Sequence, residues 1–525
     1  MDIYIYLAEL YKEIENEIAF YDDYVSENLI KKTNELYHYI HNAPKDVKEQ
    51  MVELMLKFID KKKPYISTWI YSFVIKLYPV PTLMEQFQKY TLCYTQWKEN
   101  TKYFILNQIL SLMFRYSILE NKKNKGLFWD LFQETVNDFK GVVNINFERI
   151  SIKERNPELV IVITDQILGE HHSPTMVTLE RCRILKKYLG KKVLLINTAE
   201  CISLLGEIPF FMNSRANYNE NLMDKKILTW KDVEIEYIQC ENRMPSKDIL
   251  ELLLSYIQKV KPYFILGLGG TSILTNLANM IVPVLVEEFS ARLAVTMADY
   301  QIFSYKMPEE DKELLEERGI NPNNLIKSEV MLSIPEQKKK ITKMELGLPE
   351  NKFILITMGN RLDDEVTDEF AYVLENVLDD DTIMVFCGNF QSYENFINKH
   401  FKLKDKTYYI GVTDDILAVL ENCDLYVNMI RKGGGTTGTA AIYKGIPVVT
   451  TSYGDIAGNV GKDFVTDSYD TMIDLIKKYK EDNIFYESQS QKAKEHAEKV
   501  LNAKEIYANT IRNFEKRLLL QEEEK

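Results

Sequence analysis

The feature that most constrains the fold is an alternation of short apolar runs with helical patterns, repeated in two blocks. In the first block, from about residue 157, LVIVIT, KVLLIN, YFILGLG and PVLVEE are separated by segments such as MVTLERCRILKKYLG. The second block begins near residue 350 and contains FILITMG, TIMVFCG, KTYYIG, LYVNMI and IPVVTT. Apolar runs that alternate with helices predict parallel sheets covered on both faces. The chain is therefore predicted to be an α/β protein with two doubly wound, Rossmann-like domains.

Three regions follow from this pattern. The residues before about 150 are predicted to form a series of helices. The segment MVELMLKFID, for example, places its apolar residues on one face at helical spacing. A polar, helix-poor stretch around ERGINPNNLIKSEV and IPEQKKKIT separates the two sheet blocks. Doubly wound domains bind ligands at the carboxyl ends of their strands, so we expect the two domains to face a cleft that holds the active site. The expected division is an all-helical N-terminal domain over 1–150, a first Rossmann-like domain over 151–345, and a second over 346–525 with C-terminal helices.

Size, charge and cysteine usage limit the function classes. The chain has 525 residues, which is more than one hydrophobic core usually supports. Its formal charge of −13 argues against a nucleic-acid binder, because phosphate contacts need surplus Lys and Arg. The six cysteines are scattered without Cys-x-x-Cys spacing, as in a reducing compartment, and the first residues lack the basic-then-apolar order of a signal peptide. We therefore expect a cytoplasmic protein.

One segment, Tyr263 to Val286, has no charged residue and is long enough to span a bilayer. A Gly-Gly-Thr-Ser break, two asparagines and Pro283 interrupt it, and their polar groups would need partners at mid-depth. We expect a buried strand, a turn, a helix and a second strand here, and no integral membrane segment.

The second block contains a loop, RKGGGTTG, between the strand LYVNMI and a short helical run. Gly433, Gly434 and Gly435 allow the backbone to approach a ligand closely. A helix that begins at this point directs unpaired amides and the positive end of its dipole toward the ligand, and Thr436 and Thr437 add hydroxyl donors. These are the parts of a diphosphate cradle; a glycine turn with a threonine cap is the alternative. The position at the end of a strand in the second sheet favours the cradle.

Two well-known phosphate-binding patterns do not fit. A P-loop requires G-x-x-x-x-G-K-[ST], which the glycine loop does not contain. The dinucleotide fingerprint G-x-G-x-x-G begins at Gly267 and Gly269 but has Ser272 in place of its last glycine. ATPase, GTPase and dehydrogenase functions are therefore disfavoured.

The segment GGGTTGTAAIYKGIPVVTTSYGDIAGNVG resembles the donor-binding segment of GT-B glycosyltransferases, and most of all the O-GlcNAc transferase-like group, which includes bacterial cytoplasmic protein glycosyltransferases. The matching parts are Thr436-Thr437-Gly438, the Gly-x-Pro-x-Val-Thr run from Gly445, and Gly454-Asp455. The resemblance extends over 350–465, is weaker over 157–300 and is absent before 150. It implies a GT-B fold and transfer of a sugar from a nucleotide diphosphate donor, with a UDP-sugar expected, to a polypeptide or glycan acceptor.

The same resemblance implies further donor-binding residues. MGNRLDDE matches the stretch that places a cation and a polar side chain on the donor phosphates, although an exposed turn would explain it as well. YYIGVTDDILAVLENCDLYV resembles the stretch whose main chain edges the nucleotide base, which makes Gly411 to Asp415 an expected pocket wall. The expected donor-binding residues are Asn360, Arg361, Gly411, Lys432, Gly434, Gly435, Thr436, Thr437 and Asp455.

A histidine in the first sheet block is the candidate catalytic residue. The O-GlcNAc transferase-like group has a His-Pro-Thr after the opening strand, and this chain has His172-Ser173-Pro174-Thr175 there. His172 could act as a base or donate a hydrogen bond to a sugar or acceptor, whereas we expect His171 to be structural. A solvent-facing loop histidine is the alternative. Gly269, Gly270 and Thr271 should reach the same cleft, but a tight turn explains them equally well.

The sequence also departs from the resemblance. Retaining GT-B enzymes commonly carry two glutamates eight positions apart, and the matching positions here are Lys432 and Ala440. The O-GlcNAc transferase-like group has a ribose-binding aspartate where Ala440 stands, so that contact is missing unless Asp455 supplies it. A catalytically inactive GT-B-like binding or chaperone subunit of a glycosylation or secretion system is therefore the alternative to an enzyme. Lys432 could instead serve as a phosphate cation beside Arg431.

The expected partners follow from the resemblance. They are a nucleotide-sugar donor as co-substrate and a protein or glycan acceptor, with no other cofactor and no metal, because GT-B-type sites neutralise the diphosphate with a helix dipole, Thr and Arg. The helical N-terminal domain could dock a partner subunit or a second copy of the chain. Nothing in its sequence selects between that role and a purely structural one.

Overall fold

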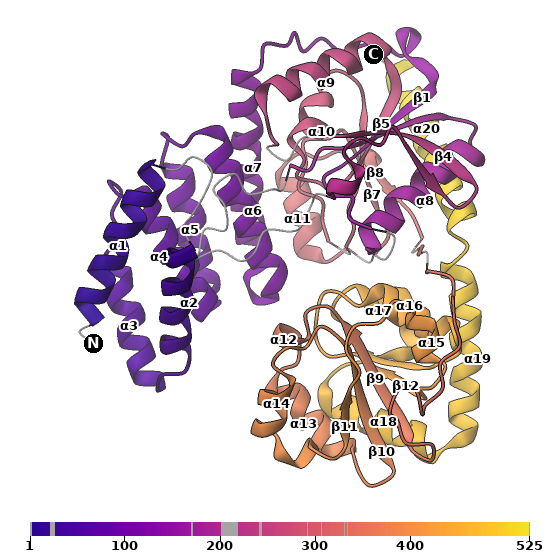
Figure 1. Cartoon of the computed structure of the whole chain (residues 1–525). Helices are drawn as coiled ribbons and strands as arrows, with labels where there is room; N and C mark the ends of the chain where they lie inside the picture. Colours follow the sequence, from indigo (N-terminus) through magenta and orange to yellow (C-terminus); the bar gives the residue numbers. More distant parts are fainter. Residues whose placement is uncertain are drawn as a thin grey trace.

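The computed structural model describes residues 3–20, 27–169, 172–200, 219–240, 244–290, 292–305, 307–329, 331–332 and 334–523. The chain forms a helical domain and two α/β domains, with the second α/β domain below the first in Figure 1 and the helical domain beside them. The mixed α/β class with two parallel-type sheets and a helical N-terminal part is as predicted. No helix among the described residues is long and apolar enough to cross a membrane.

The helical domain is built on large apolar side chains. Trp69 and Phe73 on α4 stack at a ring-centroid distance of 4.9 Å, and both are buried. This core continues onto one face of the first sheet, so the helical domain packs directly on the first α/β domain. The helices are α1 (Ile3–Phe20), α2 (Glu27–His41), α3 (Lys45–Leu56), α4 (Pro64–Leu77), α5 (Pro81–Cys93), α6 (Glu99–Arg115), η1 (Ser117–Leu119) and α7 (Lys122–Val142).

The first sheet has the strand order β3-β4-β2-β1-β5-β6-β7-β8 and is parallel except for the antiparallel hairpin β3–β4. The sequence pattern did not predict that hairpin. The strand VEIEYIQ, second from the sheet edge, alternates buried and exposed residues over most of its length, so it is not an apolar run. The strands are β1 (Asn156–Thr164), β2 (Lys192–Asn197), β3 (Ile227–Trp230), β4 (Val233–Gln239), β5 (Pro262–Leu268), β6 (Val284–Glu287), β7 (Tyr300–Phe303) and β8 (Leu325–Lys327).

Helices cover both faces of this sheet, as expected for parallel strands. The apolar segment that could have spanned a membrane forms β5, α10 and β6, which confirms the predicted strand, turn, helix and strand. Glycine and asparagine residues of that segment make hydrogen bonds inside the domain, for example from Asn276 Nδ2 to the carbonyl of Gly270. The helices are α8 (Ser173–Lys187), α9 (Lys247–Val260), α10 (Ile273–Ala278) and α11 (Glu309–Glu317).

The second sheet is parallel throughout, in the order β11-β10-β9-β12-β13-β14. Its two faces have separate apolar cores. The strands are β9 (Phe353–Gly359), β10 (Thr382–Gly388), β11 (Thr407–Tyr409), β12 (Leu425–Val427), β13 (Val448–Thr451) and β14 (Val465–Thr466). The helices are α12 (Leu362–Glu365), α13 (Asp368–Val377), α14 (Tyr393–Lys399), α15 (Ile416–Leu420), α16 (Gly435–Tyr443), α17 (Asp455–Val460), α18 (Tyr469–Glu481) and α19 (Asn483–Val500).

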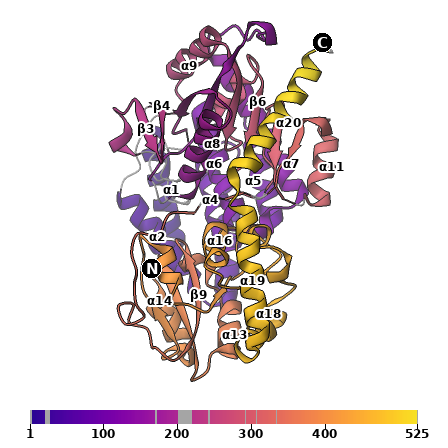
Figure 2. The same cartoon turned by 90° about the vertical axis from the view of Figure 1, so that its right-hand side faces the viewer.

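The last helix, α20 (Ala503–Glu523), crosses back to the first domain, as the yellow segment in Figures 1 and 2 shows. Its fully buried residues Tyr507, Phe514 and Leu518 belong to the core on the α8 face of the first sheet. The sequence pattern predicts that this helix belongs to the second domain, over 346–525. The structure places it with the first, because its apolar face meets β5 and β7 there.

Phe514 is the main anchor of α20, since its ring lies 5.0 Å from the ring of Phe264 and 5.1 Å from that of Tyr300. We predict that Phe514→Ala lowers the free energy of unfolding by about 3–5 kcal/mol, measured by urea denaturation. The control is Leu520→Ala on the same helix, where the side chain is exposed and the change should stay within about 0.5 kcal/mol. Equal stability of the two variants would contradict the docking of α20.

Candidate functional site

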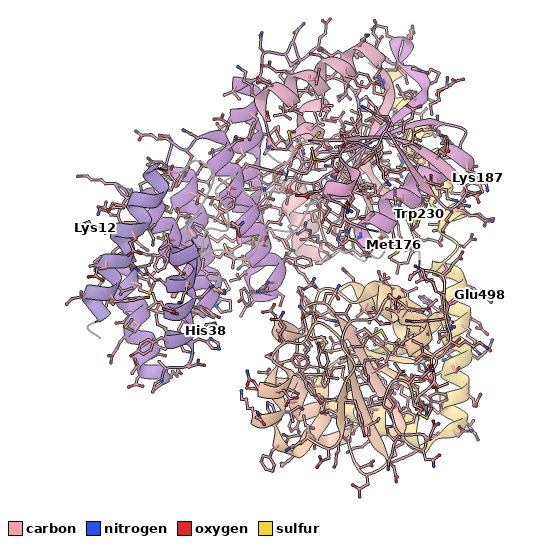
Figure 3. All side chains as sticks on the ribbon, viewed as in Figure 1. Lys12, His38, Met176, Lys187, Trp230 and Glu498 are labelled. Atoms are coloured by element: carbon pink, nitrogen blue, oxygen red, sulfur yellow. The ribbon has the colours of Figure 1, made fainter. Side chains whose placement is uncertain are left out.

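Two helix N-termini from different domains meet where the two sheets face each other. Helix α8 begins at Ser173 after β1, and α16 begins at Gly435 after β12. The hydroxyls of Ser173 and Thr436 lie 2.9 Å apart, which joins the first turns of the two helices across the domain boundary. Met176, in the first turn of α8, is labelled in Figure 3 on the side of the first domain that faces the second.

Neither helix has a capping side chain at its start. The residues before the helices, His172 and Gly434, make no side-chain capping hydrogen bond. The first turn of a helix carries N–H groups without intrahelical acceptors and the positive end of the helix dipole. Two such ends directed toward one another repel each other, and an anion between them would satisfy both. The arrangement is suited to binding a negatively charged group.

Arg431, just after β12, organises the glycine loop from inside the protein. It is buried and donates hydrogen bonds to Asn428 Oδ1 (2.7 Å), Glu365 Oε2 (2.8 Å), the carbonyl of Met358 (2.8 Å) and the hydroxyl of Tyr426 (3.0 Å). These acceptors come from the ends of β9 and β12 and from α12. Arg431 therefore fixes the carboxyl ends of two adjacent strands and is not available to a ligand.

The glycines of the loop are required by the protein's own packing. Gly434 has φ +94°, and a Cβ there would lie 2.7 Å from the Arg431 guanidinium. A Cβ at Gly435 would collide with Asn459 on α17. The glycine run thus lets the loop close around Arg431 and lets α16 pack on α17. The sequence predicts these glycines because they allow the backbone to approach a ligand closely. The structure shows a second reason, which is that a side chain at Gly434 or Gly435 would collide with Arg431 or Asn459.

The two threonines of the loop have different surroundings. Thr437 Oγ1 donates to the carbonyl of Gly434 at 3.0 Å and lies 2.7 Å from the hydroxyl of Tyr426, so it belongs to the network around Arg431. Thr436 is half-buried and its hydroxyl reaches Ser173 in the first domain. Of the two, Thr436 is therefore the one placed at the meeting point of the helices.

Arg361 lies beside the loop, as its predicted role requires. Its guanidinium is 2.9 Å from the position that a Cβ on Gly433 would occupy. Glu365 holds it through an ion pair of 2.9 Å, and the other oxygen of the same carboxylate accepts from Arg431. The side chain of Arg361 remains 44% exposed, so it can still contact a ligand. Asn360 precedes it on the same exposed turn after β9.

The remaining donor-side residues surround the loop in different ways. The backbone N–H of Asp455, at the start of α17, donates to the carbonyl of Lys432 at 2.7 Å. The carbonyl of Gly411 accepts from the N–H of Gly388 at 2.7 Å, at the carboxyl end of β10. Lys432 points toward the helical domain and forms an ion pair with Glu120. Burial lowers the pKa of Lys432, and the Glu120 carboxylate opposes that shift.

The first-domain candidates divide into two groups. His172 lies next to Ser173, and its Nδ1 is 3.0 Å from the hydroxyl of Thr175, so it lies at the meeting point of the helices. His171 lies outside the described residues. Gly269, Gly270 and Thr271 follow β5 at the same edge of the sheet but are packed as a tight turn. The N–H of Gly270 donates to Glu288, and the carbonyl of Thr271 accepts from the hydroxyl of Tyr103 in the helical domain.

Ala440 is fully buried in one core of the second domain, so no contact to a ligand comes from this position. Within the described residues, no group of three or more His, Cys, Asp or Glu side chains is placed to hold a metal ion. Ser173 and the helical-domain residues near Lys432 were not among the predicted site residues. The Ser-Pro-Thr sequence at the start of α8 could have indicated Ser173 as a site residue. No pattern in the helical N-terminal sequence distinguishes Glu120 from the other acidic residues there.

Comparison with known proteins identifies the class. Residues 338–517, which form the second α/β domain and most of the C-terminal helices, match the family described as glycosyl transferases group 1. A mutant O-GlcNAc transferase from Thermobaculum terrenum superposes with a TM-score of 0.54 at 11% identity, covering 94% of this chain and 97% of that one. This likeness shows the GT-B fold. No curated protein sequence gives a match.

Two other solved structures are similar over a smaller part of the chain. A glycosyltransferase from Rickettsia africae has a TM-score of 0.47 and 13% identity, covering 69% of this chain and 99% of that one. The HepE protein of Anabaena, in complex with UDP-glucose, has a TM-score of 0.48 and 13% identity, covering 68% of this chain and 99% of that one. Residues 338–517 therefore form a domain of the glycosyl transferases group 1 family, and the chain as a whole has the GT-B fold.

The different surroundings of the two threonines lead to a prediction. Thr436→Val should weaken binding of UDP by about 1–3 kcal/mol, measured by isothermal titration calorimetry, because a hydroxyl donor to a desolvated anion is lost. Thr437→Val should mainly lower the free energy of unfolding, since its hydroxyl serves the network around Arg431. If Thr436→Val bound UDP as tightly as the unmodified protein, Thr436 would have no role in the donor site.

Proposed function

We propose that this protein transfers a sugar from a nucleotide diphosphate donor, a UDP-sugar, to a polypeptide or glycan acceptor in the cytoplasm. The observation that carries the proposal is the convergence of the α8 and α16 N-termini at Ser173 and Thr436. A leaving nucleoside diphosphate gains negative charge as the glycosidic bond breaks. Fixed amides, a hydroxyl and a guanidinium directed at that charge stabilise the transition state more than the ground state.

The donor would lie on the second domain, with its diphosphate at Gly434 to Thr436 and Arg361 across from it. Arg361 suits this role because a planar guanidinium can bind two phosphate oxygens at once. The ion pair with Glu365 restrains the guanidinium beside the loop. Asn360, Gly411, Lys432, Gly435, Thr437 and Asp455 would contribute to or support the same site. The proposed site requires no metal ion.

His172 would act on the acceptor side, because it belongs to the first domain and sits next to Ser173. If the reaction inverts the anomeric carbon, an acceptor hydroxyl or amide must lose a proton as it attacks, and the imidazole could take it. If the reaction retains the configuration, the same side chain could hold a donor sugar hydroxyl. The contact of its Nδ1 with the hydroxyl of Thr175 at 3.0 Å orients the imidazole ring.

A non-catalytic binding or chaperone subunit is the second candidate. The burial of Ala440 favours it, because the expected acidic contact to the donor ribose cannot come from this position. The presence of Arg361, Thr436 and His172 around one junction favours the enzyme. The two candidates differ in one measurable property, which is whether a sugar leaves the nucleotide.

The deciding experiment incubates the protein with UDP-sugars and measures released UDP, once in EDTA and once with added Mn²⁺. An enzyme should release UDP above the rate of the protein-free solution in both conditions. Binding of UDP-sugar without release, in the presence of candidate acceptor peptides, would support the binding subunit instead. Release that depends strictly on Mn²⁺ would contradict only the proposed absence of a metal requirement.

His172→Ala should depress transfer more than it depresses UDP binding. Loss of a general base costs roughly 10²–10⁴-fold in rate, whereas the nucleotide belongs to the other domain. The two quantities to compare are kcat for sugar transfer and the Kd of UDP. Normal turnover in the variant would leave His172 as a structural residue at the start of α8.

A further inference from the structure

The connection from α6 to α7 in the helical domain touches the second α/β domain beside the glycine loop. Arg115 pairs with Asp364 on α12 at 3.4 Å, and Ser117 lies beside the buried hydroxyl of Tyr453. The chain thus brings a segment near residue 115 against helix α12 and the loop that contains Tyr453, both more than 200 residues further along the sequence. These contacts place helical-domain side chains next to the cations of the proposed donor site.

Phe114, in the last turn of α6, contacts two of those cations with one ring. The ring centroid lies 5.4 Å from Arg361 Cζ and 5.2 Å from Lys432 Nζ. The electron-rich face of an aromatic ring attracts a cation within about 6 Å of its centroid. Two like charges held on one ring repel each other, so an anion placed between them gains from both. Phe114 is half-buried and therefore keeps a fixed position.

Glu120, at the other end of the connection, pairs with Lys432. Both side chains are mostly buried, with 12% of Lys432 and 15% of Glu120 exposed. Other charged groups close to this pair have partners of their own, since Arg292 pairs with Glu288 and Lys125 with Asp311. An ammonium group has three donors, and among the described residues Lys432 Nζ has the ion pair with Glu120 but no hydrogen-bond acceptor of good geometry.

We propose that the helical domain completes the donor-phosphate site through these two residues. Phe114 is a positioning residue that holds the side chains of Arg361 and Lys432 together next to the glycine loop. Glu120 competes with the diphosphate for Lys432, so that donor binding releases Glu120 from this contact. The inference rests on the proposed function and extends it, because it assigns to the helical domain a direct part in donor binding rather than only a docking role.

Substitutions at the two positions should change donor affinity in opposite directions. Phe114→Leu keeps an apolar side chain but removes the ring face, so the Kd of UDP and of inorganic pyrophosphate should rise roughly 5- to 30-fold, as loss of two cation–π contacts predicts. Phe114→Tyr keeps the ring and should restore binding to within about 2-fold of the unmodified protein. Isothermal titration calorimetry on the full chain measures each Kd.

Glu120→Gln should tighten UDP binding by roughly 2- to 10-fold, since it removes the competing carboxylate and its repulsion of the diphosphate. The matched control is Glu313→Gln. Glu313 also pairs with a lysine across a domain boundary, Lys122 at 2.7 Å, but lies away from the glycine loop. This control should leave the Kd of UDP unchanged. Glu120→Gln removes a charge and leaves the size of the side chain almost unchanged, so this variant should fold. It therefore tests the inference even if Phe114→Leu destabilises the protein.

The outcomes separate the inference from the proposed function. UDP binding by the unmodified protein together with unchanged Kd values in Phe114→Leu and Glu120→Gln would overturn the inference and leave the proposed function standing. Weaker UDP binding in both variants would contradict the proposal that Glu120 competes with the diphosphate for Lys432. Both residues would then serve only to stabilise the interface between the helical domain and the second α/β domain. Failure of the unmodified protein to bind UDP, UDP-sugars or pyrophosphate would overturn the proposed function and the inference with it.

Discussion

The buried guanidinium of Arg431 is the interaction on which the donor side of the molecule depends. A charged group removed from water must have partners for its donors, and Arg431 finds them on β9, β12 and α12. The loop that follows can close around it only because Gly434 has no side chain. The Glu365 carboxylate pairs with both the buried Arg431 and the partly exposed Arg361. Because Arg431 fixes the position of Glu365, it also fixes the position of Arg361. The start of α16 is thereby fixed before any ligand binds.

Much of the fold could be predicted from the sequence, because parallel strands covered on both faces are apolar along their whole length. β5, buried at every position, is an example. The hairpin β3–β4 could not be predicted in that way, since its alternating pattern depends on one face being exposed. The attachment of α20 depends on which surface its apolar stripe meets, and a stripe does not specify its partner.

The place of the glycine loop in the fold could be predicted from the sequence, but its contacts with the first domain could not. A glycine-rich turn at a strand end indicates where a helix N-terminus will lie, and the loop from Gly433 to Thr437 lies there. The contact of Thr436 with Ser173 joins residues 263 positions apart, so only the folded chain shows that a second helix starts opposite the first. The same limit applies to Phe114, which looks like any other core aromatic of a helical domain until Arg361 and Lys432 are placed against it.

The crossing of α20 back to the first domain has a mechanical consequence. The polypeptide passes between the two α/β domains twice, once before β9 and once between α19 and α20, and the two passages touch, since the N–H of Leu332 donates to the carbonyl of Val500 at 2.9 Å. Two adjacent connections act as a hinge with one axis rather than as a flexible tether. Twisting or sliding of one domain on the other would break this pair, whereas rotation about it would not. The favoured motion is one that separates Thr436 from Ser173 and brings them together again.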